Sequence, residues 1–177
     1  MKPTIIAIVG ASGCGKTILS KILQSQFDIP AIVSTTTRPK RESETEGEDY
    51  YFVRNTRKYD REDMLTHTVF GKYEYFCLKN QVPPTGYCSY VVEENGVKAL
   101  KASSGKDYNV FTVLVTCSSA KLLERGIAPE RIERDNKRKQ IGYDLVDVVI
   151  GNNGTLAEFE QGAGDIMKIL EQWRHLL

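Results

Sequence analysis

The chain has few of the residues that build metal sites or disulfide frameworks. Its 177 residues include only two histidines, His67 and His175, so we expect no histidine-based metal site. Four cysteines are scattered along the chain, at Cys14, Cys77, Cys88 and Cys117. No two of them form a C-x-x-C pair, which argues against a zinc site and against a disulfide scaffold. We therefore expect four reduced thiols.

The sequence also lacks an excess of charge of one sign and any long apolar run. Its net charge is +1, which gives no electrostatic case for nucleic acid or an anionic membrane as the main partner. No stretch approaches the ~20 apolar residues that span a bilayer, and the short apolar run near the start does not resemble a signal peptide. With 41% hydrophobic and 27% charged residues, the composition predicts one globular domain, and we expect it in the cytoplasm.

A glycine-rich segment is the strongest motif in the chain. Residues 10–17 read GASGCGKT and match the pattern G-x-x-x-x-G-K-[ST]. The apolar run Thr4–Val9 before it predicts a buried strand, and the apolar residues of Lys16–Phe27 recur at helical spacing. These apolar residues are Ile18, Ile22 and Leu23. Strand, glycine turn and helix together form the context that a phosphate-binding loop requires.

Each position of this segment has a physical role in binding a polyphosphate. Glycines let the backbone approach a ligand closely, so that successive N–H groups converge on phosphate oxygens beside the positive end of the helix dipole. The pattern predicts that Lys16 neutralises the β- and γ-phosphates and that the Thr17 hydroxyl binds Mg²⁺. The predicted nucleotide-binding residues of the loop are Gly10, Ala11, Ser12, Gly13, Cys14, Gly15, Lys16 and Thr17.

A second basic segment follows the short apolar run Ala31–Val33. Arg38 and Arg41 lie three residues apart around a proline, and an acidic run, residues 42–49, comes next. A solvated basic turn beside an acidic loop would explain this composition. Alternatively, the two guanidinium groups form a fork for a second phosphate group, because arginine's planar donors match phosphate oxygens. In that case the chain could hold two phosphorylated substrates.

The order of these motifs resembles the guanylate kinase family. After GASGCGKT come STTTRPxRxxE at residues 34–44 and GxDYxFV at residues 47–53, at family spacing. Later landmarks are sparser, at residues 69–75, 96–98 and 149–152. The resemblance implies a single α/β domain over residues 1–177, of the three-layer P-loop NTPase fold with a central parallel sheet. It implies a core (1–33, 87–125 and 141–177), an inserted strand-rich monophosphate-binding lobe (34–86) and a helical lid (126–140).

The resemblance also implies roles for the acceptor side. Ser34 would contact guanine, while Arg38, Arg41 and Tyr50 would hold the acceptor monophosphate. The family's further phosphate-binding tyrosine falls on Tyr75, or, one position earlier, on Glu74 with Tyr73 as the nearest aromatic residue. The full predicted acceptor set is Ser34, Arg38, Arg41, Glu44, Tyr50, Thr66, Tyr75, Cys77 and Glu93.

Some base-binding positions depart from the family pattern. Thr66 stands where the family has a glutamate that accepts from guanine, and Glu93 stands in place of an aspartate. Losing a charge-assisted pair to buried donors costs about 1.5–3 kcal/mol, or roughly a hundredfold in discrimination. Phe76 and Cys77 replace a glycine and a hydroxyl residue. Guanine specificity is therefore less secure than kinase activity, and a different acceptor nucleotide is the first alternative.

Residues 125–139 form a second basic cluster. As a helix from Pro129 it has many opposite charges four residues apart, which a solvated face would explain. The resemblance instead implies the lid, whose arginines reach the transferring phosphoryl group. The predicted catalytic residues are Lys16, Arg38, Arg131 and Arg134. Arg125 and Arg138 are the next candidates in the lid, and Asn152 is expected near the adenine of ATP.

The rest of the chain predicts core elements. Apolar runs at 87–92, 110–115 and 146–150 are typical of parallel strands covered on both faces. Residues 155–177 predict an amphipathic helix that Gly162 and Gly164 could break. Its expected buried stripe is Leu156, Phe159, Ile166, Ile169, Leu170 and Trp173.

Together these features predict a nucleoside monophosphate kinase. It would transfer the γ-phosphoryl group of Mg-bound ATP to GMP or dGMP, with ATP and Mg²⁺ as cofactors, as a monomer or homodimer. The second alternative is a non-catalytic guanylate-kinase-like module that binds a phosphopeptide. The intact phosphate loop favours the enzyme.

Overall fold

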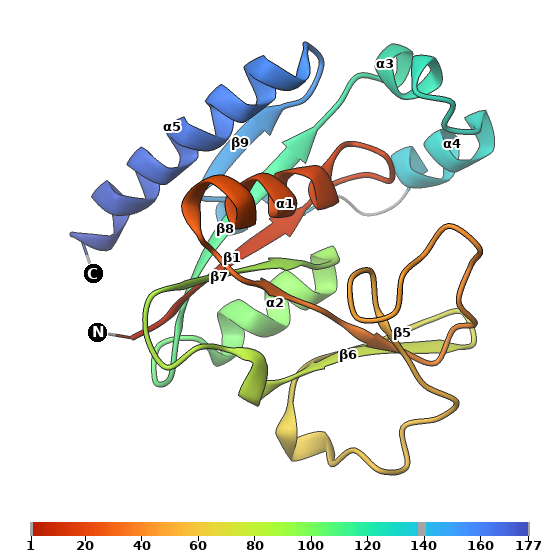
Figure 1. The fold of residues 1–177 in the computed structure, drawn as a ribbon, viewed down its shortest axis with the longest axis vertical. Helices are drawn as coiled ribbons and strands as arrows, with labels where there is room; N and C mark the ends of the chain where they lie inside the picture. Colours follow the sequence, from red (N-terminus) through yellow and green to blue (C-terminus); the bar gives the residue numbers. More distant parts are fainter. Residues whose placement is uncertain (1, 138–140, 177) are drawn as a thin grey trace.

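A computed structural model describes residues 2–137 and 141–176, and its centre is a five-stranded parallel sheet (Figure 1). The strand order is β2-β7-β1-β8-β9. The strands are β1 (Thr4–Val9), β2 (Ala31–Ile32), β7 (Tyr87–Val91), β8 (Asn109–Thr116) and β9 (Val148–Gly151). The predicted apolar runs are therefore strands of one sheet, as expected.

Helices cover both faces of this sheet. All six residues of β1 are buried, and alternate side chains point to opposite faces. Ile6 and Ile8 pack against α1 (Lys16–Phe27) and α5 (Leu156–Arg174). Ile5 and Ala7 pack in the same cluster as residues of α2 (Glu94–Ser103), on the other face. The predicted three-layer α/β architecture is confirmed.

A second sheet is inserted into the chain between β2 and β7. Its strand order is β4-β3-β6-β5, and it lies below the central sheet in Figure 1. Its members are β3 (Thr35–Thr36), β4 (Tyr51–Phe52), β5 (Met64–Phe70) and β6 (Tyr73–Leu78). The antiparallel pair β5–β6 turns at Gly71, whose φ is 61°. Sequence patterning missed β3, because two threonines inside a polar segment give no apolar signal.

Two short helices follow β8. The first, α3 (Ser119–Glu124), is capped by Ser118, whose hydroxyl accepts a hydrogen bond from the Lys121 backbone N–H. The second, α4 (Pro129–Lys137), begins at the predicted proline. Residues 79–85, which include Pro83 and Pro84, form no regular helix, only a 3₁₀ turn at Lys79–Gln81. Two further 3₁₀ turns are Arg61–Asp63 and Tyr143–Leu145.

Parts of the expected helix packing are wrong. Phe159, Ile166 and Leu170 are buried, but Leu156 is 59% exposed and Ile169 40%. Ile18 of α1 is also exposed. These side chains lie at the edges of the helical stripes, where periodicity alone does not distinguish contact from solvent.

The glycines of α5 do not break it. The helix is continuous through Gly162 and Gly164. A Cβ atom at Gly162 would lie 2.9 Å from the Ile150 side chain, so this glycine lets the helix pack closely on β9. Helix-breaking propensity is thus outweighed by tertiary packing.

No helix within residues 2–137 and 141–176 is long and apolar enough to cross a membrane. The same residues contain no group of three or more histidine, cysteine, aspartate or glutamate side chains placed to hold a metal ion.

Candidate active site

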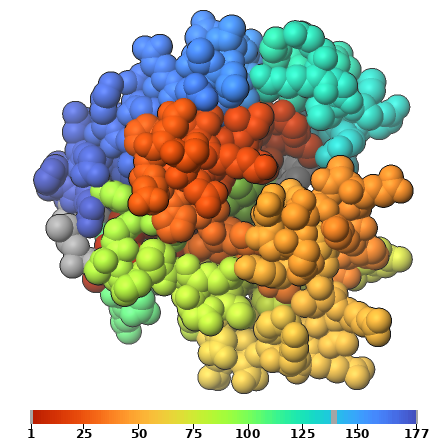
Figure 2. Space-filling model, viewed as in Figure 1, coloured from red at the N-terminus to blue at the C-terminus, as the bar shows by residue number. Residues whose placement is uncertain are grey.

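A cavity of about 480 Å³ lies between the two sheets and α4, where the carboxyl ends of β1 and β7 meet. Figure 2 shows the surface hollowed between the orange segment after β2 and the cyan segment that contains α4. Ligands of open α/β sheets bind at this edge. The predicted site residues that line the cavity are Gly10, Ser12, Lys16, Ser34, Arg38, Arg41, Glu44, Tyr50, Thr66, Tyr75, Glu93, Arg131 and Arg134.

The phosphate loop adopts backbone conformations that require glycine. Gly10 and Gly15 have φ values of 152° and 109°, and a Cβ atom at Gly15 would collide with Nδ2 of Asn152. The Lys16 ammonium group donates to the carbonyl oxygens of Gly10 and Ala11, both at 2.8 Å. Lys16 is therefore folded over its own loop, beside the cavity that it lines.

Asn152 lies under the phosphate loop rather than in the cavity. Its buried side chain donates from Nδ2 to the Cys14 carbonyl oxygen at 2.9 Å. Arg125 donates from Nη2 to the Asn152 backbone oxygen and to Oδ1, at 3.0 and 2.9 Å. Of the described residues, neither Asn152 nor Arg125 lines the cavity. Both side chains brace the loop from below.

On the acceptor side, Arg38 and Glu44 form a two-pronged ion pair. Their nitrogen–oxygen distances are 2.7 and 3.0 Å, and both side chains are only 11% exposed. Glu44 also accepts from the Arg41 backbone N–H at 2.8 Å. The hydrogen bond from Arg38 outweighs burial and lowers the pKa of Glu44. Two guanidinium groups and one carboxylate leave one net positive charge at this end of the cavity.

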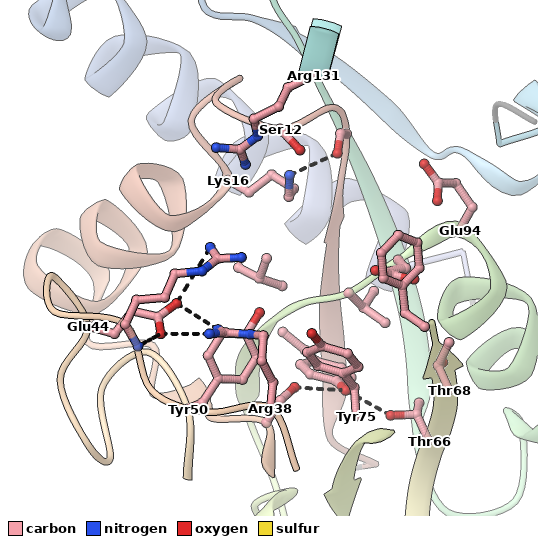
Figure 3. A pocket seen from close by; sticks show the side chains of 18 of the residues that line it. Ser12, Lys16, Arg38, Glu44, Tyr50, Thr66, Thr68, Tyr75, Glu94 and Arg131 are labelled. Carbon is pink, nitrogen blue, oxygen red and sulfur yellow. Dashed lines mark hydrogen bonds and ion pairs between the residues drawn. The ribbon is translucent and has the colours of Figure 1, made fainter. Parts of the chain in front are cut away.

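Two phenol groups complete this end. The rings of Tyr50 and Tyr75 meet edge to face with centroids 5.9 Å apart, and the Arg38 guanidinium lies 5.4 Å from the Tyr50 ring centroid. Burial raises the pKa of Tyr50, so its hydroxyl stays protonated at neutral pH. Figure 3 shows Lys16 and Arg131 at one end of the cavity and Arg38, Glu44 and Tyr50 at the other.

The structure distinguishes the two registers that the sequence left open for β6. Tyr75 lines the cavity, whereas its neighbour Glu74 binds His67 Nε2 at 2.7 Å and the hydroxyl of Thr56 at 3.0 Å. Because successive side chains of a strand point to opposite faces, only one of the two can face the cavity.

The base-side residues are joined by hydroxyl hydrogen bonds. Tyr90 on β7, which sequence reasoning missed, is 2.7 Å from Thr66 Oγ1 and accepts from Ser34 Oγ at 3.3 Å. Thr66 Oγ1 is in turn 3.4 Å from Cys77 Sγ. Cys77 is fully buried behind Thr66 and is not among the described residues that line the cavity. The sequence offered one indication of this role, because the hydroxyl of a tyrosine inside an apolar core strand needs a hydrogen-bond partner.

Sequence reasoning also missed Thr68, Phe70 and Glu94, which line the same cavity. Thr68 and Phe70 could have been found from the sequence, because every second residue of a strand points to the same face and both therefore share a face of β5 with Thr66. Phe70 is 45% exposed and presents an aromatic ring at the cavity. Glu94 is the first residue of α2 and follows the predicted Glu93.

In the lid segment, Arg131 and Arg134 both line the cavity. Arg134 donates from Nε and Nη2 to Asp135 Oδ1 at 3.0 and 2.8 Å. Asp135 Oδ2 accepts from the Ser12 backbone N–H at 2.7 Å. Burial opposes ionisation of Asp135, but hydrogen bonds from Ser12 and Arg134 prevail and lower its pKa to about 2. Arg138 lies outside the described residues.

A second cavity of about 690 Å³ adjoins the first. Thr17 lines it, together with Lys21 of α1 and Asp49. Ser34 and Tyr50 line both cavities and form part of the wall between them. Four loop residues, Ala11, Gly13, Cys14 and Gly15, line neither cavity within the part of the chain described, so the loop meets the main cavity at Gly10, Ser12 and Lys16.

The geometry places two anion-binding groups across one cavity. One group consists of glycine-rich backbone, Lys16 and lid arginines, and the other of Arg38, Arg41 and two phenols. Such an arrangement can hold two phosphorylated molecules with their phosphates facing each other and neutralise charge between them.

Comparisons with known proteins agree with this geometry. The family model described as Guanylate kinase matches residues 1–154. Guanylate kinase of Chlamydia trachomatis serovar D is 32% identical over 157 residues, covering 82% of this chain and 74% of the relative. That of Hyphomonas neptunium is 47% identical over 164 residues, covering 84% and 76%. The crystal structure of guanylate kinase from Anaplasma phagocytophilum superposes with a TM-score of 0.61 at 21% identity, covering 97% of this chain and 86% of that one.

Proposed function

This chain belongs to the guanylate kinase family, and from that premise we propose how its cleft carries out the ATP-dependent phosphorylation of GMP. A single observation supports the assignment of roles. Two positively charged, phosphate-sized sites line the same cavity from opposite ends, with Lys16 and Arg134 at one and Arg38 and Arg41 at the other. An in-line transfer between two phosphates needs this arrangement.

We assign the phosphate loop and lid to ATP. The backbone N–H groups of the loop bind the β- and γ-phosphates, and Lys16 leaves its carbonyl partners to contact them. Arg131 and Arg134 approach from α4 and neutralise charge on the transferring phosphoryl group. Asn152 and Arg125 hold the loop in shape from below.

Thr17 is the residue that we assign to Mg²⁺. Its side chain is exposed at the start of α1 and makes no hydrogen bond within the described residues, so its oxygen is available as a ligand. Mg²⁺ usually keeps several waters and is bound together with substrate phosphates, and a hydroxyl at this position of the phosphate loop is the ligand that the loop pattern supplies. When bound there, Mg²⁺ would supply positive charge beside the phosphates of ATP.

The acceptor phosphate is assigned to Arg38, Arg41, Tyr50 and Tyr75. Glu44 accepts hydrogen bonds from both terminal nitrogens of Arg38, Nη1 and Nη2, and so fixes the guanidinium group. Little side-chain freedom is then lost when the phosphate binds. A monophosphate oxygen is already a nucleophile, and the site needs no general base. Catalysis then depends on positioning and charge.

For the guanine base we assign the hydroxyls of Ser34, Thr66 and Tyr90 together with Glu93. A hydroxyl can donate to a carbonyl oxygen such as guanine O6, and a carboxylate can accept from ring N–H groups. Cys77 would influence the base only indirectly, through its contact with Thr66. The same set accepts dGMP as readily as GMP, because none of these groups is assigned to the sugar.

An assay of ADP release with ATP and Mg²⁺ across GMP, dGMP, IMP, AMP, CMP and UMP tests the assignment. We expect turnover with GMP and dGMP and at least about a hundredfold lower kcat/KM with AMP. If another nucleotide turns over while GMP and dGMP do not, the assignment of the base side is wrong and the phosphate assignment stands. If no nucleotide turns over, both are wrong.

Further assignments complete the proposal. Residues 34–86 would act as the acceptor lobe and residues 126–140 as the lid, closing on a core made of 1–33, 87–125 and 141–177. Closure would exclude water and suppress hydrolysis of ATP. Activity as a monomer or homodimer in the cytoplasm, with no nucleic-acid or membrane partner, stays a prediction.

A further inference from the structure

Asp135 connects the predicted lid to the phosphate loop. Its carboxylate is 4% exposed and makes contacts in two directions. Oδ2 accepts from the Ser12 backbone N–H at 2.7 Å, across 123 positions of sequence. Oδ1 accepts from Nε and Nη2 of Arg134 at 3.0 and 2.8 Å. A single side chain therefore fixes both the lid and one of its arginines.

This contact leaves the nucleotide end of the cleft usable. Within the described residues, the backbone N–H groups of Gly13 and Gly15 make no hydrogen bond to the protein. Asp135 therefore does not occupy this part of the phosphate loop. The cavity of about 480 Å³ lined by Ser12, Lys16 and Arg134 is open with the contact made. Asp135 thus occupies the apex of the loop and does not fill the space where phosphates would bind.

The contact also sets the direction of Arg134. A guanidinium group has five N–H donors in a rigid plane, and Asp135 engages two of the three nitrogens. Nη2 also lies 3.4 Å from Ser12 Oγ, which keeps the plane beside the loop. Nη1 makes no hydrogen bond within the part of the chain described and belongs to a side chain that lines the cavity.

We propose that Asp135 is a positioning residue that docks the lid on the phosphate loop before ATP binds and aims Arg134 at the transferring phosphoryl group. The inference rests on the proposed assignment of this end of the cleft to ATP. The lid arginine is then in place when ATP arrives, and binding spends less free energy on ordering it.

The kinetic test compares two carboxylates of the same helix. Asp135→Asn keeps the shape of the side chain and removes its charge, whereas Glu133→Gln makes the same change in an exposed pair with Lys137. We expect Asp135→Asn to lower kcat/KM for ATP by about ten- to a hundredfold, because hydrogen bonds to charged groups are lost. The KM for GMP should change less than about threefold, and Glu133→Gln should match the wild type.

A double variant tests whether Asp135 acts through Arg134. If it does, Asp135→Asn should cost much less in an Arg134→Ala background than in the wild type. If the two losses multiply fully, Asp135 does not position Arg134 and the proposal fails. The proposal also fails if Asp135→Asn binds ATP more tightly, because the carboxylate would then be a competitor of the phosphates.

A structural measurement tests the contact without turnover. By NMR, the Ser12 amide of the ligand-free protein should exchange its hydrogen more slowly than the Gly13 amide, and Asp135→Asn should abolish that difference. Equal exchange rates in the wild type would overturn the proposal. If the wild type itself fails to phosphorylate GMP while the Ser12 amide is protected, the assigned function fails and the docking contact stands.

Discussion

The two ends of the cleft each hold an arginine with a carboxylate, but the two pairs are connected differently. Arg38 and Glu44 lie six residues apart on one loop, and Glu44 adds a bond to the Arg41 backbone of the same loop. Asp135 holds the adjacent Arg134 and then reaches across the fold to Ser12. The acceptor-side pair can move as a unit with its loop, whereas the lid-side pair joins two separate parts of the molecule.

Burial differs as well. Both members of the Arg38–Glu44 pair are 11% exposed, whereas the Arg134 side chain is 49% exposed and only Asp135 is buried. A buried pair contributes little net stability but fixes geometry, and breaking it leaves an uncompensated charge. We therefore expect the acceptor side to be preset within its loop, and the lid side to depend on one tertiary contact.

Removing the Lys16 side chain, which lines the cavity between the Arg38–Glu44 and Arg134–Asp135 pairs, should lower activity more than any other change considered. Lys16→Ala should lower kcat by about a thousandfold or more, because the transferring phosphoryl group loses a positive charge in a site largely shielded from water. ADP release under saturating ATP and GMP measures the loss. Lys168→Ala, which removes an exposed lysine paired with Asp165, is the matched control and should leave kcat unchanged. An unchanged kcat in Lys16→Ala would argue against the phosphate assignment of the loop.

Glu44→Gln should affect binding of the acceptor and leave binding of ATP nearly unchanged. The substitution frees Arg38 from one carboxylate and should raise the KM for GMP about tenfold, because the guanidinium is no longer fixed, while the KM for ATP stays within about twofold. Steady-state kinetics with each substrate varied in turn measures the split. Glu42→Gln, in an exposed residue of the same loop, is the control. A change on the ATP side of equal size would show that the two ends are coupled.

Arg41→Ala should give a smaller loss on the same side. Its side chain is 64% exposed and lies 3.9 Å from Glu44, so water screens its charge more than that of Arg38. We expect a rise of about fivefold in the KM for GMP that grows smaller at high ionic strength. A larger effect than that of Arg38→Ala would reverse the assigned order of the two arginines.

The pH dependence of stability should show the lid contact on its own. The pKa of Asp135 is about 2 in the folded chain and 3.8 without the contacts, so its stabilising contribution is complete above pH 3.8 and is lost as the pH falls toward 2. The free energy of unfolding of Asp135→Asn should be lower than that of the wild type by roughly 2 kcal/mol at pH 6, and the difference should shrink as the pH falls and be lost below about pH 2. Denaturant unfolding at both pH values measures the difference. A gap that is constant with pH would mean that the carboxylate makes no such contact.

Local sequence patterns predicted the parts of the site that the chain builds locally. The phosphate loop follows from eight consecutive residues between a strand and a helix, and one short segment offered Arg38 and Arg41 as a phosphate fork, whereas Tyr50 was implied by the family resemblance. The central strands followed from apolar runs because both faces of the sheet are covered.

Residues whose role depends on tertiary contacts could not be found in this way. Tyr90 meets Ser34 and Thr66 only because β7 of the core lies beside the inserted sheet. Asp135 is one charge in a run of charges, and nothing in that run distinguishes the carboxylate that reaches Ser12 from those that face water. Asn152, predicted near the adenine, supports the loop, because Gly15 leaves room for its amide, and no sequence pattern indicated this contact.

The wall that Ser34 and Tyr50 share between the two cavities links what happens on its two sides. Because each of these side chains lines both cavities, a shift of either one toward one cavity would open space in the other. Lys21 and Gln24 of α1 line the second cavity, so an acceptor nucleotide that moves Ser34 or Tyr50 would change the surroundings of this helix face. A dye attached at that helix face would act as a gauge of acceptor occupancy that does not depend on catalysis.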